Sequence, residues 1–343
     1  MASIRKKLLT WYDREGRDLP WRRTRDPYAI WVSEVMLQQT RVDTVIPYYE
    51  RFLSSFPTAG ALAEADEDAV LAHWSGLGYY RRARLLHQGV QEVVAEYGGA
   101  VPEDAKARRG LPGVGRYTAG AIGSIAFDKE EPVVDGNVSR VLCRLFRIDT
   151  RLGTTETTRR LWEEAAHLVV GERPGDLNQA LMELGATICT PKRPRCEACP
   201  VSKDCEALAN DETGSLPVKL ARKAPKQVEL AAVVATRGRG ARRKIWLIKG
   251  DQPLFGGLWG VPMAEGNPRT ALVEAGLEAR LQTKPIGQVK HVLTHRRLQI
   301  DIFLASAARG TESKNGQLFA PESLQQVGVS TLTWKILERA RLS

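Results

Sequence analysis

The first 210 residues repeat apolar positions at the three- and four-residue spacing of amphipathic helices. One helix is predicted to end at Gly16. The pair Asp26-Pro27 is typical of the cap and first residue of a second helix, which continues through YAIWVSEVML. Further helices are predicted over EDAVLAHW, RRARLLHQGVQEVVAEY, NVSRVLCRLF and TRRLWEEAAHLVV. Residues 1–210 are therefore expected to form an all-helical domain.

The pattern changes after residue 210. Residues 211–227, DETGSLPVKLARKAPKQ, lack apolar periodicity and contain two prolines, which is typical of a linker. Beyond them come runs rich in β-branched residues, VELAAVVATRG, RKIWLIKG and RLQIDIFLAS, and one helical stretch, NPRTALVEAGLEARL. Residues 228–343 are therefore predicted to form a smaller α+β domain.

Composition narrows the class of protein. A chain of 343 residues with 43% hydrophobic residues can bury two cores. It lacks a run of eighteen apolar residues, and its charged start lacks the apolar centre of a secretory signal, so we expect a cytoplasmic protein without a membrane partner. Residues 226–343 hold 18 Lys and Arg against 9 Asp and Glu. This surplus suits a polyanion such as nucleic acid, and it suits a solvated basic surface equally well.

The stretch LPGVGRYTAGAI, residues 111–122, predicts a glycine hairpin that opens a helix. With VPEDAKARRG before it, the stretch makes a helix-hairpin-helix over about residues 103–127. Glycines let the backbone approach a phosphate closely, and the first-turn amides of the second helix can point at it. An ordinary helix–helix turn is the alternative, but nearby Lys106, Arg108 and Arg109 favour phosphate binding. The candidate DNA contacts are Leu111, Gly113, Val114 and Gly115.

Four of the five cysteines lie close together. Cys189, Cys196, Cys199 and Cys205 have the spacing C-x6-C-x2-C-x5-C, which indicates a metal site rather than disulfides. Four thiolates suit either a tetrahedral zinc or a [4Fe–4S] cluster, and the ligands alone do not separate the two.

Two carboxylates are candidates for catalysis. Glu34 lies mid-helix among apolar neighbours, where desolvation is expected to raise its pKa and keep a proton available for general-acid chemistry. Asp135 follows an apolar run and precedes a helix. Taken singly, Glu34 also fits a solvated helix position, and Asp135 fits a turn or helix cap. Together they suit the cleavage of an N-glycosidic bond, by analogy with paired carboxylates in glycoside hydrolysis.

These motifs, in this order, resemble the endonuclease III superfamily of DNA glycosylases, and within it the MutY family of adenine glycosylases. The resemblance rests on DLPWR, WVSEVMLQQTRV, GLGYYRRARLL, LPGVGRYTAGAI, VDGNVSRVLCR and NQALMELGATICT, which span most of residues 18–205. It implies an all-α helix-hairpin-helix domain whose loop at residues 189–205 carries a [4Fe–4S] cluster. It also implies excision of adenine mispaired with 8-oxoguanine, and of adenine opposite guanine.

The resemblance also implies roles for single residues. Glu34 protonates adenine, Asp135 stabilises the cationic sugar with or without a transient covalent adduct, and Tyr117 and Asn137 orient that carboxylate and the sugar. The implied pocket residues are Trp21, Arg22 and Gln179, and those inserted into the opened stack are Gln39 and Tyr79. The implied partner is duplex DNA carrying an A:8-oxoguanine mispair, bound by a monomer that associates with the nucleoid if the source is bacterial.

Tyr117 separates two activities. Bifunctional members of the superfamily have a lysine here that attacks the sugar and cuts the strand through a Schiff base, which a phenol cannot form. The sequence therefore predicts a glycosylase that leaves an abasic site uncut. The alternatives are a glycosylase-lyase for oxidised pyrimidines and a non-catalytic iron–sulfur DNA-binding protein.

The C-terminal region resembles a Nudix-like domain. An active Nudix domain needs several carboxylates in the core of its helix to bind magnesium. Only Glu274 lies there in this chain, so nucleotide hydrolysis is not expected. The family recognises the oxidised guanine with a loop that corresponds here to Leu293, Thr294 and His295. The family commonly has an aromatic residue, serine and histidine there, and a simple β-turn is the alternative interpretation.

Overall fold

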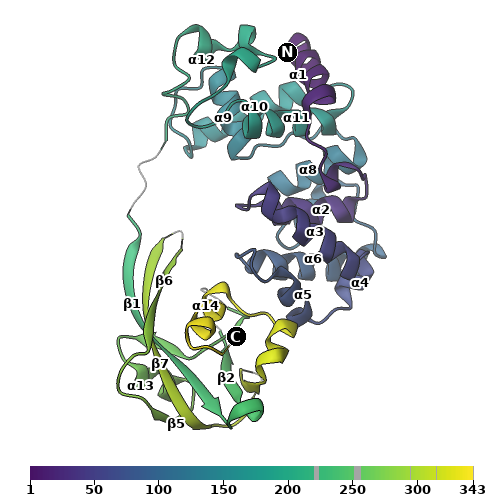
Figure 1. The fold of residues 1–343 in the computed structure, drawn as a ribbon. Helices are drawn as coiled ribbons and strands as arrows, with labels where there is room; N and C mark the ends of the chain where they lie inside the picture. Colours follow the sequence, from purple (N-terminus) through teal and green to yellow (C-terminus); the bar gives the residue numbers. More distant parts are fainter. Residues whose placement is uncertain (220–223, 251–255, 294, 314, 343) are drawn as a thin grey trace. The chain divides into compact units, whose positions relative to one another are not determined.

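The computed structural model describes residues 1–219, 224–250, 256–293, 295–313 and 315–342 (Figure 1). Helices fill the first part of the chain, and strands follow from residue 226 onward. The chain divides into two compact units. One contains residues 1–63 and 88–222, and the other contains residues 64–87 and 223–343. We describe each unit by itself.

The first unit is helical. Its core joins helices from both ends of the unit, with Leu8, Val138, Leu161 and Leu181 among the buried side chains. In the described residues its helices are α1 (Ala2–Glu15), α2 (Pro27–Leu37), α3 (Val42–Ser55), α4 (Ala59–Ala63), α7 (Ala105–Gly110), α8 (Arg116–Phe127), α9 (Gly136–Leu145), α10 (Thr155–Val169), α11 (Pro174–Thr187) and α12 (Glu206–Ala209), with short 3-10 turns at Pro20–Arg22, Cys196–Ala198 and Ser202–Asp204. Helix α6 (Arg81–Tyr97) crosses the boundary between the units.

Helix α2 begins at a local cap. The Asp26 carboxylate accepts hydrogen bonds from the amides of Tyr28 and Ala29 at 3.2 and 3.1 Å, and Pro27 occupies the first helical position. Every residue from 28 to 36 is buried, so α2 has no solvent face. A helix that is buried all round is a central core element, and any polar side chain on it is desolvated.

The second unit is built on a sheet. Strands β1 (Lys226–Arg237) and β7 (Arg296–Arg309) run parallel at its centre, with Leu230 opposite Ile300. Among the described residues the path is β3-β2-β1-β7-β5, while β4 pairs with β1, β6 with β7 and β8 with β2. The remaining strands are β2 (Lys244–Lys249), β3 (Trp259–Gly260), β4 (Met263–Glu265), β5 (Glu278–Leu281), β6 (Gly287–Val292) and β8 (Gly316–Phe319).

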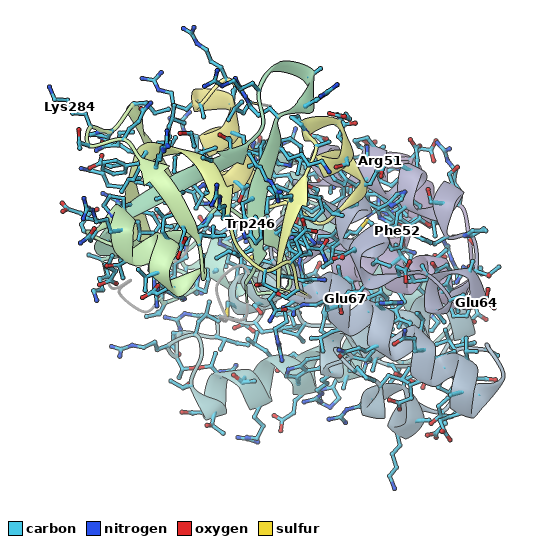
Figure 2. The ribbon with its side chains drawn as sticks, turned by 90° about the horizontal axis from the view of Figure 1, so that it is seen from below. Arg51, Phe52, Glu64, Glu67, Trp246 and Lys284 are labelled. Carbon is cyan, nitrogen blue, oxygen red and sulfur yellow. The ribbon has the colours of Figure 1, made fainter. Side chains whose placement is uncertain are left out.

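Alternate residues of β1 point to opposite faces of this sheet, and each face has its own core. One face packs with residues of α14 (Thr331–Arg339), and the other packs with residues of α13 (Pro268–Glu274). Trp246 of β2 is buried on the α13 side and lies among the strands, whereas Lys284 points outward (Figure 2). The helical domain followed by a Nudix-like α+β domain was predicted, and the architecture confirms it.

Residues 64–87 group with the sheet although the sequence assigns them to the helical region. They include α5 (Glu67–Trp74), and their polar side chains have partners beyond residue 240. Ser75 Oγ and Tyr80 Oη donate to the Val329 carbonyl at 3.0 and 3.3 Å, and Lys249 pairs with Asp68 at 2.8 Å. Such long-range contacts leave no mark on local periodicity, so the sequence could not indicate them.

The predicted linker is partly packed. Arg144 Nε donates to the Leu216 carbonyl at 3.0 Å and the Leu152 amide donates to the Val218 carbonyl at 2.9 Å, so residues 216–218 belong to the first unit. Strand β1 begins at Lys226, two residues before the predicted domain start. The predicted domain bounds themselves stay a prediction. Within the described ranges, no helix combines the length and apolar character needed to span a membrane.

Candidate active site

All four predicted catalytic residues line one pocket of about 430 Å³ in the first unit. It lies between the 3-10 turn before α2, α2 itself, the first turn of α8, the start of α9 and the face of α11. This volume falls within the range of small-molecule sites, which is about 300–1,000 Å³. The sequence-predicted residues that the structure brings together here are Trp21, Arg22, Glu34, Gln39, Tyr117, Asp135, Asn137 and Gln179.

Glu34 is the buried carboxyl of this pocket. It is 4% exposed because α2 has no solvent face, which excludes the solvated helix position that the sequence allowed. Burial raises the pKa of Glu34 to about 7, a hydrogen bond from Tyr117 lowers it in part, and the charge of Asp135 raises it further. The side chain therefore keeps its proton up to about pH 7 instead of losing it near pH 4.5, which makes it available as a general acid.

Tyr117 contacts Glu34. Its hydroxyl donates to Glu34 Oε2 at 2.6 Å and lies 3.3 Å from the Met182 sulfur. Burial, together with the nearby charges of Glu34 and Asp135, raises the pKa of Tyr117 well above its ordinary value, so the phenol stays protonated and remains a donor. The sequence led us to expect Tyr117 beside the Asp135 carboxylate. In the structure its hydrogen bond is made to the acid instead.

Asp135 is both a helix cap and a pocket residue. Its Oδ1 accepts the Val138 amide at 2.6 Å at the start of α9, so the cap that the sequence allowed is present. Burial raises the pKa of Asp135, while hydrogen bonds from the amides of Val138 and Asn137 oppose that rise. The cap also fixes the carboxylate in place, with its position set by the helix backbone.

Asn137 is held from behind by a residue that sequence reasoning missed. Arg140 Nη2 donates to Asn137 Oδ1 at 2.8 Å and to the Gly185 carbonyl at 2.7 Å, and Arg140 Nε donates to the Cys189 carbonyl at 2.7 Å. With Oδ1 occupied, the amide of Asn137 is left to face Asp135. Only its position one helical turn after Asn137 could have drawn attention to Arg140.

Glu183 is a second missed residue. Its side chain is fully buried in the pocket wall and accepts from Arg17 Nε at 2.7 Å and from Arg22 Nη2 at 2.9 Å. Burial opposes its ionisation, but these two arginines hold the pKa of Glu183 below its usual range. Glu183 thereby fixes Arg22, a predicted pocket residue. Its spacing of four residues after Gln179 on α11 is the one available signal.

Gln39 and Tyr79 share an unusual backbone conformation. Their φ angles are 58° and 48°, a left-handed region that non-glycine residues rarely adopt. Gln39 lines the pocket, while Tyr79 belongs to the second unit, is 48% exposed and lies against Arg82. Six further non-glycine residues of the described chain adopt the same region, so the backbone conformation by itself does not distinguish Gln39 and Tyr79.

The helix-hairpin-helix lies where the sequence predicts it, as α7 and α8. Leu111 and Val114 are buried, so their side chains are packed in the core and only their backbone is available to a phosphate. Gly113 has a φ of 75°, which suits glycine, and Gly115 begins α8 without a side-chain cap. The first-turn amides of α8 therefore lack a side-chain acceptor, as in an anion site.

One residue used to support phosphate binding was interpreted wrongly. Arg108 has no exposed surface and forms an ion pair with Glu131 inside the fold. It is therefore unavailable to DNA, whereas Lys106 and Arg109 are exposed.

The four motif cysteines line a single small pocket, in which the chain brings thiols from residues 189–205 together. Arg144 joins this pocket to α9, since its Nη1 donates to the Cys189 sulfur at 3.3 Å and its carbonyl accepts from Cys205 Sγ at 3.4 Å. Across the described part of the chain, no three His, Cys, Asp or Glu side chains are already arranged to hold a metal ion. The donor set and its convergence in one pocket fit a thiolate-ligated group.

In the second unit, the predicted recognition loop is the turn between β6 and β7. The Leu293 amide donates to the Arg296 carbonyl at 2.8 Å, Leu293 packs on the core and His295 is exposed. Thr294 lies outside the described residues. The sequence placed Glu274 in the middle of a helix. In the structure it is the exposed last residue of α13.

Comparisons agree with both domains. Residues 32–167 match the HhH-GPD superfamily of base excision DNA repair proteins, and residues 233–339 match the NUDIX domain. A solved thermostable thymine-DNA glycosylase is 34% identical with a TM-score of 0.56, covering 61% of this chain and 98% of that one. An endonuclease III trapped covalently on DNA is 21% identical with a TM-score of 0.52, covering 61% and 95%, and shows the fold alone.

A curated relative extends over both domains. The adenine DNA glycosylase of Rattus norvegicus is 38% identical over an alignment of 403 positions, gaps included, which covers 100% of this chain and 76% of the relative. The resemblance inferred from the motifs is thereby confirmed. This chain belongs to the adenine DNA glycosylase family of base-excision repair proteins.

Proposed function

We propose that this protein excises adenine from double-stranded DNA by hydrolysing the N-glycosidic bond, and that it leaves the strand uncut. The observation that carries the proposal is the state of the Glu34 carboxyl. It is buried in the pocket, it accepts a hydrogen bond from Tyr117, and its pKa is raised to about 7. Adenine must leave the stack to reach it, because the bond is inaccessible inside the duplex.

Glu34 is the proton donor of this reaction. Transfer of its proton to a ring nitrogen makes adenine a neutral leaving group, so the base departs with the electrons of the broken C–N bond. Tyr117 remains protonated throughout and holds the carboxylate that Glu34 becomes. The hydrogen bond is thus stronger after the proton has left, which favours the transfer.

Asp135 and Asn137 act on the sugar. As the base leaves, positive charge develops on the sugar ring, and the Asp135 carboxylate stabilises it, either as an ion pair or as a transient adduct at the anomeric carbon. Water then adds to that carbon and passes its proton to the Glu34 carboxylate, which restores the acid. Because Val138 and Asn137 fix the carboxylate, little reorganisation accompanies the step.

Strand cutting is not part of the proposal. It needs an amine that attacks the sugar. Among the described residues that line the pocket none is a lysine. The hairpin position at which bifunctional members of the superfamily have a lysine is occupied here by Tyr117.

The other predicted parts complete the proposal. The α8 amides grip a phosphate, Gln39 and Tyr79 enter the opened stack, and Trp21, Arg22 and Gln179 surround the base. The turn with Leu293, Thr294 and His295 distinguishes 8-oxoguanine from guanine opposite the adenine. The protein acts as a monomer in the cytoplasm.

Cys189, Cys196, Cys199 and Cys205 hold a [4Fe–4S] cluster, which ties the 189–205 loop together. Their convergence in one pocket supports this, and so does the presence of Arg144 beside it. Iron and sulfide analysis with a visible absorption spectrum separates this cluster from zinc. A colourless protein with one bound zinc would contradict it.

A base-release assay tests the function. Duplexes carry adenine opposite 8-oxoguanine, guanine or cytosine, and a fourth carries an oxidised pyrimidine. We expect adenine release opposite 8-oxoguanine and guanine, with strand cleavage only after alkali. Equal cleavage without alkali, or a covalent complex trapped by borohydride, would contradict the proposal. Binding without any release would favour a non-catalytic DNA-binding protein.

A further inference from the structure

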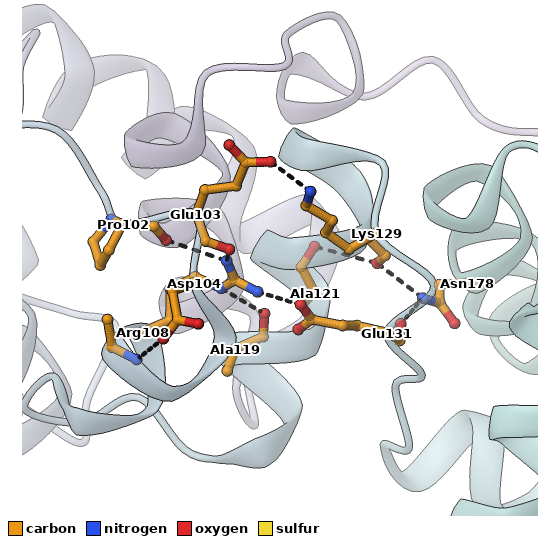
Figure 3. A network of polar contacts seen from close by, with 11 residues as sticks. Pro102, Glu103, Asp104, Arg108, Ala119, Ala121, Lys129, Glu131 and Asn178 are labelled. Atoms are coloured by element: carbon orange, nitrogen blue, oxygen red, sulfur yellow. Dashed lines mark hydrogen bonds and ion pairs between the residues drawn. The ribbon is translucent and has the colours of Figure 1, made fainter.

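A buried arginine connects the DNA-gripping hairpin to the segment that carries Asp135. Arg108, on α7, has no exposed surface. Its guanidinium donates to the carbonyls of Pro102 (3.1 Å), Glu103 and Ala119 (3.3 Å), which lie before α7 and on α8 (Figure 3). A buried charge is costly without partners, so this site is built to hold a guanidinium.

The remaining partner of Arg108 lies outside the hairpin. Its Nη2 donates to the carboxylate of Glu131, four residues before Asp135 (Figure 3). The Glu131 backbone is held as well, because Asn178 Nδ2 donates to the Glu131 carbonyl at 2.8 Å and to Ser124 Oγ at 2.8 Å. Asn178 is buried and precedes the pocket residue Gln179 on α11. Residue 131 is thus fixed by side chain and by backbone, from two helices.

Two glycines of α8 allow the segment to lie this close. A methyl group on Gly120 would overlap the Pro132 carbonyl, and one on Gly123 would overlap both the Arg108 guanidinium and the Glu131 carboxylate. The ion pair and the backbone after it therefore lie directly on α8, the helix whose N-terminus is proposed to bind a phosphate. Buried Val133 then leads to the Asp135 cap.

From these contacts we propose that Arg108 and Glu131 are positioning residues: their ion pair makes the hairpin and the Asp135 segment one rigid body, so that gripping the DNA also places the Asp135 carboxylate. Its catalytic part rests on the proposed function. A misplacement of about 1 Å at a reacting group costs on the order of a hundredfold in rate. Loss of the pair should therefore slow base release and leave DNA affinity nearly unchanged.

Glu131→Gln is the main variant, since it keeps the shape and removes the charge. Arg108→Met and the double variant complete a double-mutant cycle. We expect Glu131→Gln to lower the single-turnover rate about tenfold to a hundredfold, with the dissociation constant for a non-cleavable adenine analogue changed less than about threefold. The double variant should lose no more than the worse single variant, because both remove the same interaction.

A surface ion pair gives the matched control. Lys129 pairs with Glu103 at 2.5 Å and joins the same two segments, but both side chains are about half exposed (Figure 3). Exposed pairs contribute little. Glu103→Gln should therefore keep the wild-type rate and melting temperature.

Hydrogen exchange provides a readout that needs no activity. The Val138 amide bonds to Asp135 Oδ1, so its exchange reports the geometry of the cap. We expect it to exchange faster in Glu131→Gln than in wild type or Glu103→Gln, with the amides of α1 unchanged. This would hold even if wild-type protein released no adenine, a result that would overturn the proposed function alone.

The inference fails on any of three results. Unchanged Val138 exchange in Glu131→Gln would show that the pair does not hold the Asp135 segment. A wild-type rate with a lowered melting temperature would make the pair a stabilising contact only. A rate and an affinity that fall in parallel would place its effect on DNA binding rather than on Asp135.

Discussion

The pocket of the first unit and the β6–β7 turn of the second unit differ in how their polar side chains are held. In the pocket, without DNA, Glu34 accepts a hydrogen bond from Tyr117 and Asp135 accepts one from the Val138 amide. At the turn, His295 is exposed on a short connection between two strands. Groups that are held in place before the reaction lower its barrier. Exposed groups on a turn are suited to bind one ligand in preference to another. Substitutions in the pocket should therefore change rate, and those at the turn should change preference.

Glu34→Gln carries the largest expected effect. Removal of the general acid should lower the single-turnover rate of adenine release about a thousandfold. A rate within tenfold of wild type would remove Glu34 from the mechanism. Glu96→Gln, an exposed glutamate on α6, is the matched control and should keep full activity.

The same variant, which should lose activity, should gain stability at alkaline pH. The pKa of Glu34 is raised from 4.5 to about 7 in the folded protein, so that state binds more protons than the unfolded chain, and stability falls as the pH rises through this interval. Glu34→Gln removes that loss. It should melt at a higher temperature than wild type at pH 8 and lose this advantage near pH 4.5. A lower melting temperature at pH 8 would contradict the sign.

Glu183→Gln is expected to have the second-largest effect on the rate of adenine release. Without its charge, Arg17 and Arg22 lose their shared anchor on the pocket wall, and the rate should fall about tenfold. Glu163→Gln breaks an exposed pair with Arg159 and should leave the rate unchanged. Equal behaviour of the two variants would show that burial of Glu183 has no catalytic consequence.

Tyr117→Phe should change the rate only severalfold, and it should move the pH dependence. The phenol hydrogen bond lowers the pKa of Glu34, so its loss raises that pKa and shifts the midpoint of the rate profile to higher pH. Rates measured from pH 5 to 9 check this. A shift to lower pH would mean that Tyr117 stabilises the protonated acid instead.

The turn should give the smallest effect. Thr294→Ala combined with His295→Ala is expected to reduce the rate ratio for adenine opposite 8-oxoguanine over guanine about threefold or more, an amount typical of lost polar contacts. Glu34 is untouched, so release opposite guanine should stay near wild type. An unchanged ratio would exclude the turn from recognition.

Short-range patterns allowed much of this site to be predicted. The cap at Asp26, the burial of Glu34 and the helix start at Asp135 each follow from neighbouring residues. The missed features depend on partners far along the chain. Glu183 binds Arg17, which lies 166 residues away in the sequence. Arg108 was expected to face DNA, but its side chain is buried and binds Glu131, 23 residues further along the chain. A sequence without aligned homologues does not reveal such pairings.

The pH profile of wild-type adenine release tests the central claim most directly. Single-turnover rates with saturating enzyme isolate the chemical step from product release. If Glu34 is a buried acid with a pKa of about 7, the rate falls about tenfold for each pH unit above that value, and it falls again at acidic pH, where Asp135 takes up a proton. A rate that is flat from pH 6 to 9, or that rises with pH, would contradict the account.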